Sequence, residues 1–196
     1  MKYLSFRTIL YCLLFAGFVL SNYNASAQKT VIYLVRHAEK DTAKNDPGLS
    51  KAGSQRAQDL QKLLKREKIA GIYVTNYQRT LLTAKPTADK FTLVPQVYTT
   101  IDRAVATKMY QSYVGKNILI VGHSNTIVPI IMAFCNIRPF TELADGDYDM
   151  LFKITIKDGK AELEISYYGV THHVTEIPEQ YSADLNNHYT APAGRF

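Results

Sequence analysis

The sequence has little cysteine. Only two cysteines occur in 196 residues, and the first, Cys12, lies in an apolar run near the amino terminus. If that segment is removed on export, as argued below, a single thiol remains and no internal disulfide can form. Stability must then come from the hydrophobic core. Cys135 lies in the apolar run 127–137, where a small buried hydrophobic residue is expected rather than a nucleophile.

The sequence also lacks internal repeats, low-complexity segments and any linker long enough to divide it. With 46% hydrophobic and 20% charged residues, it has an ordinary globular composition, and its length suits one domain with a sizeable core. No cluster of Lys and Arg with interleaved aromatic residues is present, so no nucleic-acid partner is expected. The formal net charge is +6, or +4 without the leader described below; an excess of this smaller size suits a small anionic substrate, although a slightly basic solvated surface is the simpler explanation of the charge alone.

The first 27 residues have the pattern of a secretory signal peptide. Lys2 and Arg7 precede a short apolar run, and the polar stretch after it ends in Ala25-Ser26-Ala27. The alternative is an uncleaved membrane anchor, for which the apolar run is short. We therefore expect residues 28–196 to form the working domain, in the periplasm or outside the cell and without a stable membrane span. Loss of two basic residues and no acid lowers the formal net charge to +4. The oligomeric state is left open.

The stretch around which the rest is organised is the apolar run 31–35, which ends abruptly at Arg36-His37. Its composition is typical of a short strand buried on both faces. Open α/β sheets bind ligands at the carboxyl ends of their strands. There Arg36 can donate two hydrogen bonds to an anion, and a neutral His37 can offer one ring nitrogen as a nucleophile while the other donates to a carbonyl. The alternative is an ordinary strand end with a surface ion pair between Arg36 and Glu39.

Apolar periodicity predicts alternating strands and helices along the remaining chain. Residue 50 reads as a helix N-cap, Pro86 is expected to bend or loosen the second helix, and Pro95 places its strand at a sheet edge. A β-hairpin closes the pattern, followed by an irregular tail from residue 171. The expected elements are a loop over 41–48, helices over 51–67, opening within 75–84, over 102–113 and after 123, and strands over 69–75, 91–99, 117–121, 151–156 and 161–168.

Two further strand ends carry cationic or nucleophilic residues. Arg79 follows the second strand, at or just before a first helical turn, where backbone N–H groups favour an anion. His123 follows the strand 117–121 and Gly122, which lets the backbone approach a ligand closely. Either residue alone is explained as a solvated or locally capped side chain. Together with Arg36 and His37 they converge on one edge of the predicted sheet.

The order of these motifs resembles the histidine phosphatase superfamily. The matching motifs, from about Thr30 to Tyr168, are Arg36-His37, Leu49-Ser50-Lys51-Ala52-Gly53, Thr75-x-x-x-Arg79-x-x-x-Thr83-Ala84 and Gly122-His123. The resemblance implies an α/β three-layer sandwich of phosphoglycerate-mutase-like fold, with a mostly parallel central sheet flanked by helices. It also implies a metal-independent phosphatase without a cofactor, acting on a small phosphorylated substrate.

By that resemblance, His37 takes the phosphoryl group as a phosphohistidine that water later hydrolyses. Arg36, Arg79 and His123 complete the phosphate pocket, with His123 expected as an imidazolium. Phosphoryl transfer needs mainly in-line positioning and positive charge around the equatorial oxygens, which this set provides. Further candidates for substrate contacts are Ser124 and Asn125 with their turn N–H groups, and Lys40. Glu39 is expected to brace Arg36.

One part of the family pattern is missing, because no glutamate occurs between Glu67 and Glu142 to act as general acid. Asp102 is our candidate proton donor; its alternative role is the N-cap of the helix it precedes. A non-catalytic phospho-ligand binder and a mutase-type phosphoryl transferase remain alternatives. His172 and His173 suggest a metal, but adjacent strand residues point to opposite faces, and solvated or structural histidines are expected instead.

Overall fold

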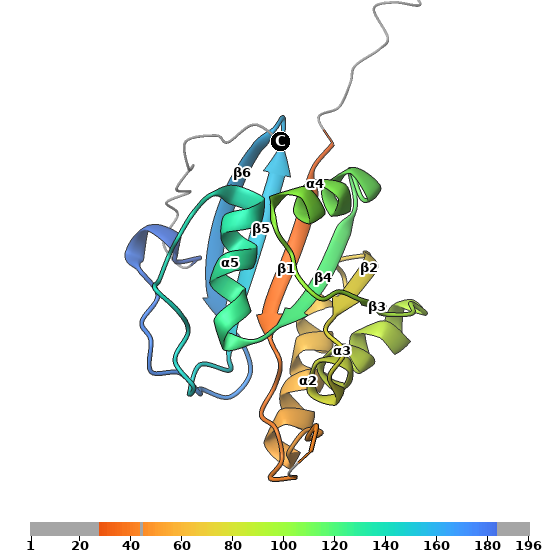
Figure 1. Cartoon of the computed structure of the whole chain (residues 1–196), viewed down its shortest axis with the longest axis vertical. Coiled ribbons are helices and arrows are strands. Elements are labelled where there is room, and N and C mark those ends of the chain that lie inside the picture. The colour runs from red at the N-terminus through yellow and green to blue at the C-terminus, as the bar shows by residue number, and fades with distance from the viewer. Residues whose placement is uncertain (1–27, 44, 184–196) are drawn as a thin grey trace, which may run out of the picture.

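A computed structural model describes residues 28–43 and 45–183, and the predicted signal peptide and the last residues of the tail lie outside this part of the chain. Six strands form one sheet in the order β3-β2-β4-β1-β5-β6 (Figure 1). The four strands from β3 to β1 are parallel, and the hairpin continues the sheet antiparallel beyond β1. The strands are β1 (Thr30–Arg36), β2 (Ile69–Val74), β3 (Gln96–Val97), β4 (Asn117–Gly122), β5 (Met150–Lys157) and β6 (Lys160–Tyr167).

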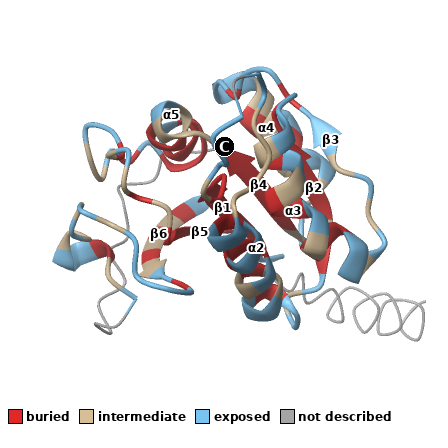
Figure 2. Cartoon of the chain, turned by 90° about the horizontal axis from the view of Figure 1, so that it is seen from below, coloured by how far each residue is buried: buried red, intermediate tan, exposed pale blue. Residues whose placement is uncertain are grey.

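Four helices cover the two faces of this sheet. Alternate residues of β1 point to opposite faces, so Tyr33 packs with α2 (Lys51–Leu64) and α3 (Gln78–Phe91). Leu34 packs on the other face with α4 (Arg103–Ser112) and α5 (Ser124–Cys135). The strands are largely buried between helices that expose only their outer sides (Figure 2). The predicted mostly parallel three-layer sandwich is thus confirmed.

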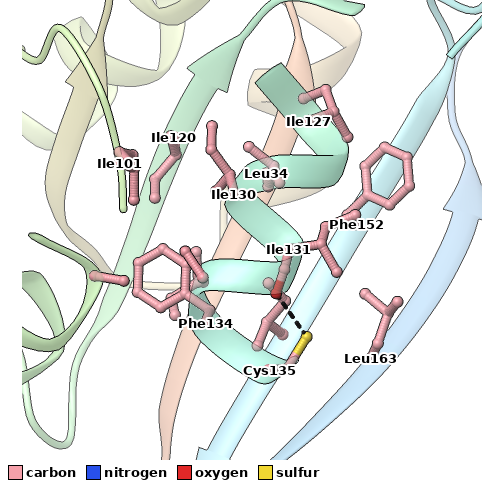
Figure 3. Packing of buried hydrophobic residues seen from close by; sticks show 14 of the residues in the cluster. Leu34, Ile101, Ile120, Ile127, Ile130, Ile131, Phe134, Cys135, Phe152 and Leu163 are labelled. Atoms are coloured by element: carbon pink, nitrogen blue, oxygen red, sulfur yellow. Dashed lines mark hydrogen bonds between the residues drawn. The ribbon is translucent and has the colours of Figure 1, made fainter. Parts of the chain in front are cut away.

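Among the helices of residues 28–183, α5 is the most apolar, and it anchors the core on its face of the sheet. Ile127, Ile131 and Phe134 are fully buried, and the helix lies across β1, β4 and β5 (Figure 3). Cys135 is buried with them, and its thiol donates to the Ile131 carbonyl at 3.0 Å. Burial raises the pKa of this thiol to about 12, so Cys135 behaves as the small hydrophobic residue that the sequence predicts.

Three details differ from the expected elements or add to them. Helix α3 contains Pro86 and continues to Phe91, so the strand expected over 91–99 is reduced to Gln96–Val97. The first helix ends at Leu64, three residues earlier than expected. The described part of the tail holds one short 3₁₀ turn, Glu179–Tyr181, and Ser182 bridges to Ile165 beside β6. Among the described residues, no helix is both long and apolar enough to cross a membrane.

Candidate active site

The carboxyl ends of β1 and β4 bring the two predicted histidines together. The two strands are parallel neighbours with Arg36 opposite Gly122, and the His37 N–H donates to the Gly122 carbonyl at 2.9 Å. The ring centroids of His37 and His123 are 5.2 Å apart. Residues separated by 86 positions in the sequence therefore face one site at the lower edge of the sheet in Figure 1.

His37 is buried and held in one tautomer. Its Nδ1 lies 2.8 Å from the Ala38 carbonyl, which can only accept, so the ring proton is on Nδ1 and Nε2 carries the lone pair. Burial is the main cause that lowers the pKa of His37 to about 3; the Ala38 carbonyl opposes this, while Arg36, His123 and Arg79 add to it. At neutral pH the imidazole is uncharged and available as a nucleophile.

His123 is placed by Thr75 and Arg79. Its Nε2 is 2.8 Å from the Thr75 hydroxyl, and its Nδ1 is 3.5 Å from Nη2 of Arg79, at the outer limit of a hydrogen bond. Burial, then Arg79 and Arg36, lower the pKa of His123 to about 4. The imidazolium expected from the sequence is therefore wrong for the free protein, because burial and two neighbouring guanidiniums favour the neutral ring.

Arg36 points its guanidinium toward the loop before β5. Its Nη1 donates to the carbonyls of Ala144 and Asp145 at 2.9 Å each, and its Cζ lies 4.2 Å from the ring centroid of Tyr148. The side chain is 7% exposed, and Nε is buried without a hydrogen-bond partner among the described residues. A buried donor without a partner is costly, which makes this edge of the guanidinium suited to an anion.

Glu39 does not brace Arg36, contrary to the sequence-based expectation. It pairs with Arg56 of α2, whose Nε and Nη2 donate to the carboxylate at 2.7–3.0 Å. Burial opposes ionisation of Glu39, but the Arg56 hydrogen bond and charge hold its pKa below the usual range. The acid nearest Arg36 is instead Asp145, at 3.8 Å and fully exposed. The pair of Glu39 and Arg56 fixes α2 against the segment that follows His37.

Arg79 is the second residue of α3 and lies close to the two imidazoles. Its Cζ is 4.2 Å from the centroid of the Tyr77 ring, which also contacts His123 at 5.3 Å. Its Nη1 is 3.7 Å from the carboxylate of Asp46, which also accepts from the Gln78 N–H at 3.1 Å. Asp46 from the 41–48 loop thus caps the start of α3 beside Arg79.

The threonines of the second motif hold the strand ends in place. The Thr80 hydroxyl donates to the Thr75 carbonyl and lies 3.1 Å from the Thr75 hydroxyl, which contacts His123. The Thr83 hydroxyl accepts from the Ala38 N–H at 2.9 Å. Both threonines are fully buried, so this spacing ties α3 to the backbone on either side of the site.

The remaining candidates line or flank the site without joining the cluster. Asp102 is the N-cap of α4, where its Oδ1 accepts from the Val105 N–H at 2.8 Å. Its side chain also lines a groove of about 610 Å³ along the first turns of α5, together with Ser124 and Asn125. Lys40 is exposed, and its backbone pairs with Leu49.

Sequence reasoning missed Tyr148. The centroid of its ring lies 6.0 Å from that of His37, and its hydroxyl is 3.4 Å from Nη2 of Arg36. The only available signal was its position between two aspartates directly before a buried strand, because acids at such a position need partners when buried.

Comparison with known proteins gives a family match over part of the chain and a shared fold. The family model described as "Histidine phosphatase superfamily (branch 1)" matches residues 32–102, which contain Arg36, His37 and Arg79 of the site. A search of curated proteins gave no match.

Solved structures of low sequence identity share the fold. The native mycobacterial glucosyl-3-phosphoglycerate phosphatase Rv2419c superposes with a TM-score of 0.55 at 13% identity, covering 65% of this chain and 90% of its own. The protein histidine phosphatase SixA complexed with tungstate gives 0.53 at 13% identity, covering 65% and 94%. A phosphoglycerate mutase from Bacillus anthracis str. Sterne gives 0.52 at 16% identity, covering 74% and 93%. The fold is therefore phosphoglycerate-mutase-like.

Proposed function

We propose that the chain is a member of the histidine phosphatase superfamily and a phosphatase that hydrolyses a phosphate ester or phosphoanhydride through a phosphohistidine on His37. The family match over residues 32–102 and the fold shared with solved phosphatases support this proposal. One observation carries the proposal. A neutral, tautomer-fixed His37 faces a second imidazole at 5.2 Å, with the charges of Arg36 and Arg79 close enough to both rings to lower their pKa values. That combination places a nucleophile within a cationic pocket of the kind a phosphoryl group needs.

In the proposed mechanism, Nε2 of His37 attacks phosphorus in line with the leaving oxygen. The N–P bond forms as the P–O bond breaks, and the leaving oxygen takes a proton. Water then attacks the phosphohistidine, releasing phosphate and returning the lone pair to Nε2. Arg36 and Arg79 stabilise the charge on the equatorial oxygens. A bound phosphate dianion raises the pKa of His123, so this ring can take up a proton when substrate binds.

Asp102 remains our candidate for protonating the leaving oxygen. Its carboxylate lines the groove that begins at Ser124 and Asn125, immediately after His123. The same groove has room for the rest of an organic phosphate, since ligand pockets of this size hold drug-sized molecules. If Asp102 serves only as an N-cap, Asp102→Asn will leave the turnover of alkyl and aryl phosphates nearly unchanged, because asparagine caps a helix as well as aspartate does. If Asp102 is the proton donor, Asp102→Asn will lower the turnover of alkyl phosphates and leave that of aryl phosphates with good leaving groups unchanged.

The test is turnover of p-nitrophenyl phosphate, whose good leaving group hardly needs an acid. We expect hydrolysis that vanadate inhibits, and we expect His37→Ala to lower kcat by at least ~10³-fold while the melting transition is kept. Rapid quenching of the wild type should trap phosphate on His37. A folded protein that binds phosphate but turns over nothing would instead be a phospho-ligand binder, and isomerisation of a phosphorylated sugar acid would indicate a mutase.

We also propose that the reaction needs no metal and takes place outside the cytoplasm. Metal independence predicts that EDTA leaves activity intact; activity lost to EDTA and restored by zinc would contradict it. The supporting observation for export is the signal-peptide pattern of residues 1–27. Amino-terminal sequencing of the protein recovered from the producing cells should begin at Gln28. An unprocessed amino terminus would instead support the membrane-anchor alternative.

A further inference from the structure

The loop before β5 holds Arg36 more tightly than any other group does. This arginine-holding loop, residues 144–149, offers three carbonyls to Nη1, from Ala144 and Asp145 at 2.9 Å and from Asp147 at 3.4 Å. The ring of Tyr148 covers the guanidinium face. Because a guanidinium is planar and its five N–H groups have fixed directions, fixing Nη1 also fixes the direction of the unpartnered Nε.

The loop in turn is organised by the carboxylate of Asp147, which is 1% exposed. Its Oδ2 accepts from the Ala144 N–H at 2.8 Å and the Thr175 hydroxyl at 2.6 Å. Its Oδ1 accepts from the backbone N–H groups of Val174 at 2.9 Å and Thr175 at 3.1 Å. Burial alone would raise the pKa of Asp147, but the hydrogen bonds from Thr175, Val174 and Ala144 hold it below the usual range. Four donors therefore keep a buried charge in one orientation.

A second buried carboxylate ties the same two segments together. Oδ2 of Asp149 accepts from the His172 N–H at 2.8 Å and lies 2.7 Å from Nδ1 of His173. The Tyr148 N–H donates to the His172 carbonyl at 2.9 Å, and the His172 ring packs against Tyr148 with centroids 5.2 Å apart. Residues 172–175 thus support the arginine-holding loop. Their histidines are structural, with partners in this loop.

We propose that Asp147 is a positioning residue for the phosphoryl-transfer reaction, acting through Arg36. It joins residues 172–175 to the loop whose carbonyls hold Nη1, and so keeps the Nε edge of the guanidinium toward the phosphoryl group. This inference rests on the proposed function. Its physical basis is that a bidentate contact with an anion requires the plane of the guanidinium to be set in advance. Residues 172–175, which follow β6 and lie outside any helix or strand, thereby become part of the active-site support.

The experiment compares Asp147→Asn with Asp158→Asn, the same substitution in the exposed turn between β5 and β6. The amide of the new asparagine turns an N–H₂ group toward N–H donors, so the loop should shift. We expect kcat/KM for p-nitrophenyl phosphate and the affinity for vanadate to fall by ~10- to 100-fold for Asp147→Asn, and the turn variant to match the wild type.

The decisive measurement is a double-mutant cycle with Arg36→Lys, which keeps the charge but loses the planar fork. If Asp147 acts through Arg36, Asp147→Asn should cost less than about threefold further in the lysine background. An equal loss in both backgrounds, or a lower melting temperature with unchanged kcat/KM and vanadate affinity, would overturn the inference. If Asp147→Asn does not fold, Thr175→Val removes one of the four donors and is tested in the same cycle.

Vanadate affinity separates this inference from the proposed function. A wild type that binds vanadate but has no turnover would refute the phosphatase, while the cycle in binding affinity still decides whether Asp147 positions Arg36. Conversely, the enzyme could be active while the losses caused by Asp147→Asn and Arg36→Lys are additive. That result would support the phosphatase activity and refute the positioning role of Asp147.

Discussion

The surroundings of His37 lower the pKa of its imidazole far below the ordinary value. Burial and neighbouring cations lower that pKa to about 3, so the nucleophile stays neutral down to mildly acidic pH. We therefore expect kcat/KM for p-nitrophenyl phosphate, corrected for ionisation of the substrate, to change less than about twofold between pH 8 and pH 5. A histidine with the ordinary value of about 6.5 would lose about 30-fold over that range. A pH–rate profile with an acid limb near pH 6.5 would contradict the assignment.

The hydroxyl of Thr75 sets the orientation of His123. Thr75→Val keeps the side-chain shape and removes the 2.8 Å contact with Nε2. We expect kcat/KM to fall by about fivefold, since one hydrogen bond to a partly buried ring contributes ~1 kcal/mol. The matched control is Thr107→Val, which removes a hydroxyl contact with the Arg103 carbonyl on α4. Equal activity of the two variants would show that Thr75 does not orient the ring.

At the scale of elements, helix α2 acts on the site through its first turn. Gly53 packs so closely that a Cβ atom there would overlap the carbonyl of Glu39, two residues after His37. The Ser50 N–H donates to that same carbonyl at 2.9 Å, and the Ser50 hydroxyl caps Gly53. The first turn of α2 therefore packs directly against the backbone segment that follows His37.

Because of this packing, we expect Gly53→Ala to lower stability, although helix propensity alone would raise it. Alanine in a helix is ordinarily more favourable than glycine by about 1 kcal/mol. At Gly53 we expect the reverse, because the overlap costs ~1–3 kcal/mol and lowers the melting temperature by several degrees. Activity should fall with it, since the segment after His37 must move. Ser54→Ala, one exposed position further along α2, should leave activity unchanged and should not lower the melting temperature, because alanine is the better helix former.

Local patterns sufficed to predict most of the elements. The apolar run 31–35 became β1, and the helical spacing after Ser50 became α2, because both depend on a periodicity that neighbouring residues carry. Helix α3 departs from the pattern by continuing through Pro86. Its buried contacts with β2 and β4, which local sequence does not encode, evidently outweigh the lost hydrogen bond.

Polar partnerships were harder to predict than the elements. Glu39 was expected near Arg36 because the two are close in sequence, yet Arg56 reaches it from α2. Likewise, nothing near Arg36 in the chain indicates that a loop more than 100 residues later supplies its carbonyl partners. Such pairings depend on which strand ends meet in the fold. The sequence therefore predicted the candidate side chains but not the residues that hold them in place.

Across the whole molecule, the site buries two uncharged imidazoles that would be protonated in the unfolded chain at mildly acidic pH. In the folded protein the pKa of His37 is about 3 and that of His123 about 4, both below the ordinary value of 6.5. As pH falls below about 6.5, the unfolded state binds protons that the folded state does not. The free energy of unfolding should therefore fall as the solution is acidified, until the folded pKa values are reached.

Between pH 6.5 and pH 5, the more deeply buried His37 alone should lower the free energy of unfolding by on the order of 1 kcal/mol. We expect the melting temperature to decrease by a few degrees as a result. This range lies above the ordinary pKa of the carboxylates, so histidines dominate it. In His37→Gln the same acidification should cost less, because the variant has no imidazole to protonate on unfolding. Thermal melts of both proteins at half-unit pH intervals measure the difference. Parallel curves would mean that His37 is charged or exposed in the native protein, and the nucleophile assignment would lose its physical basis.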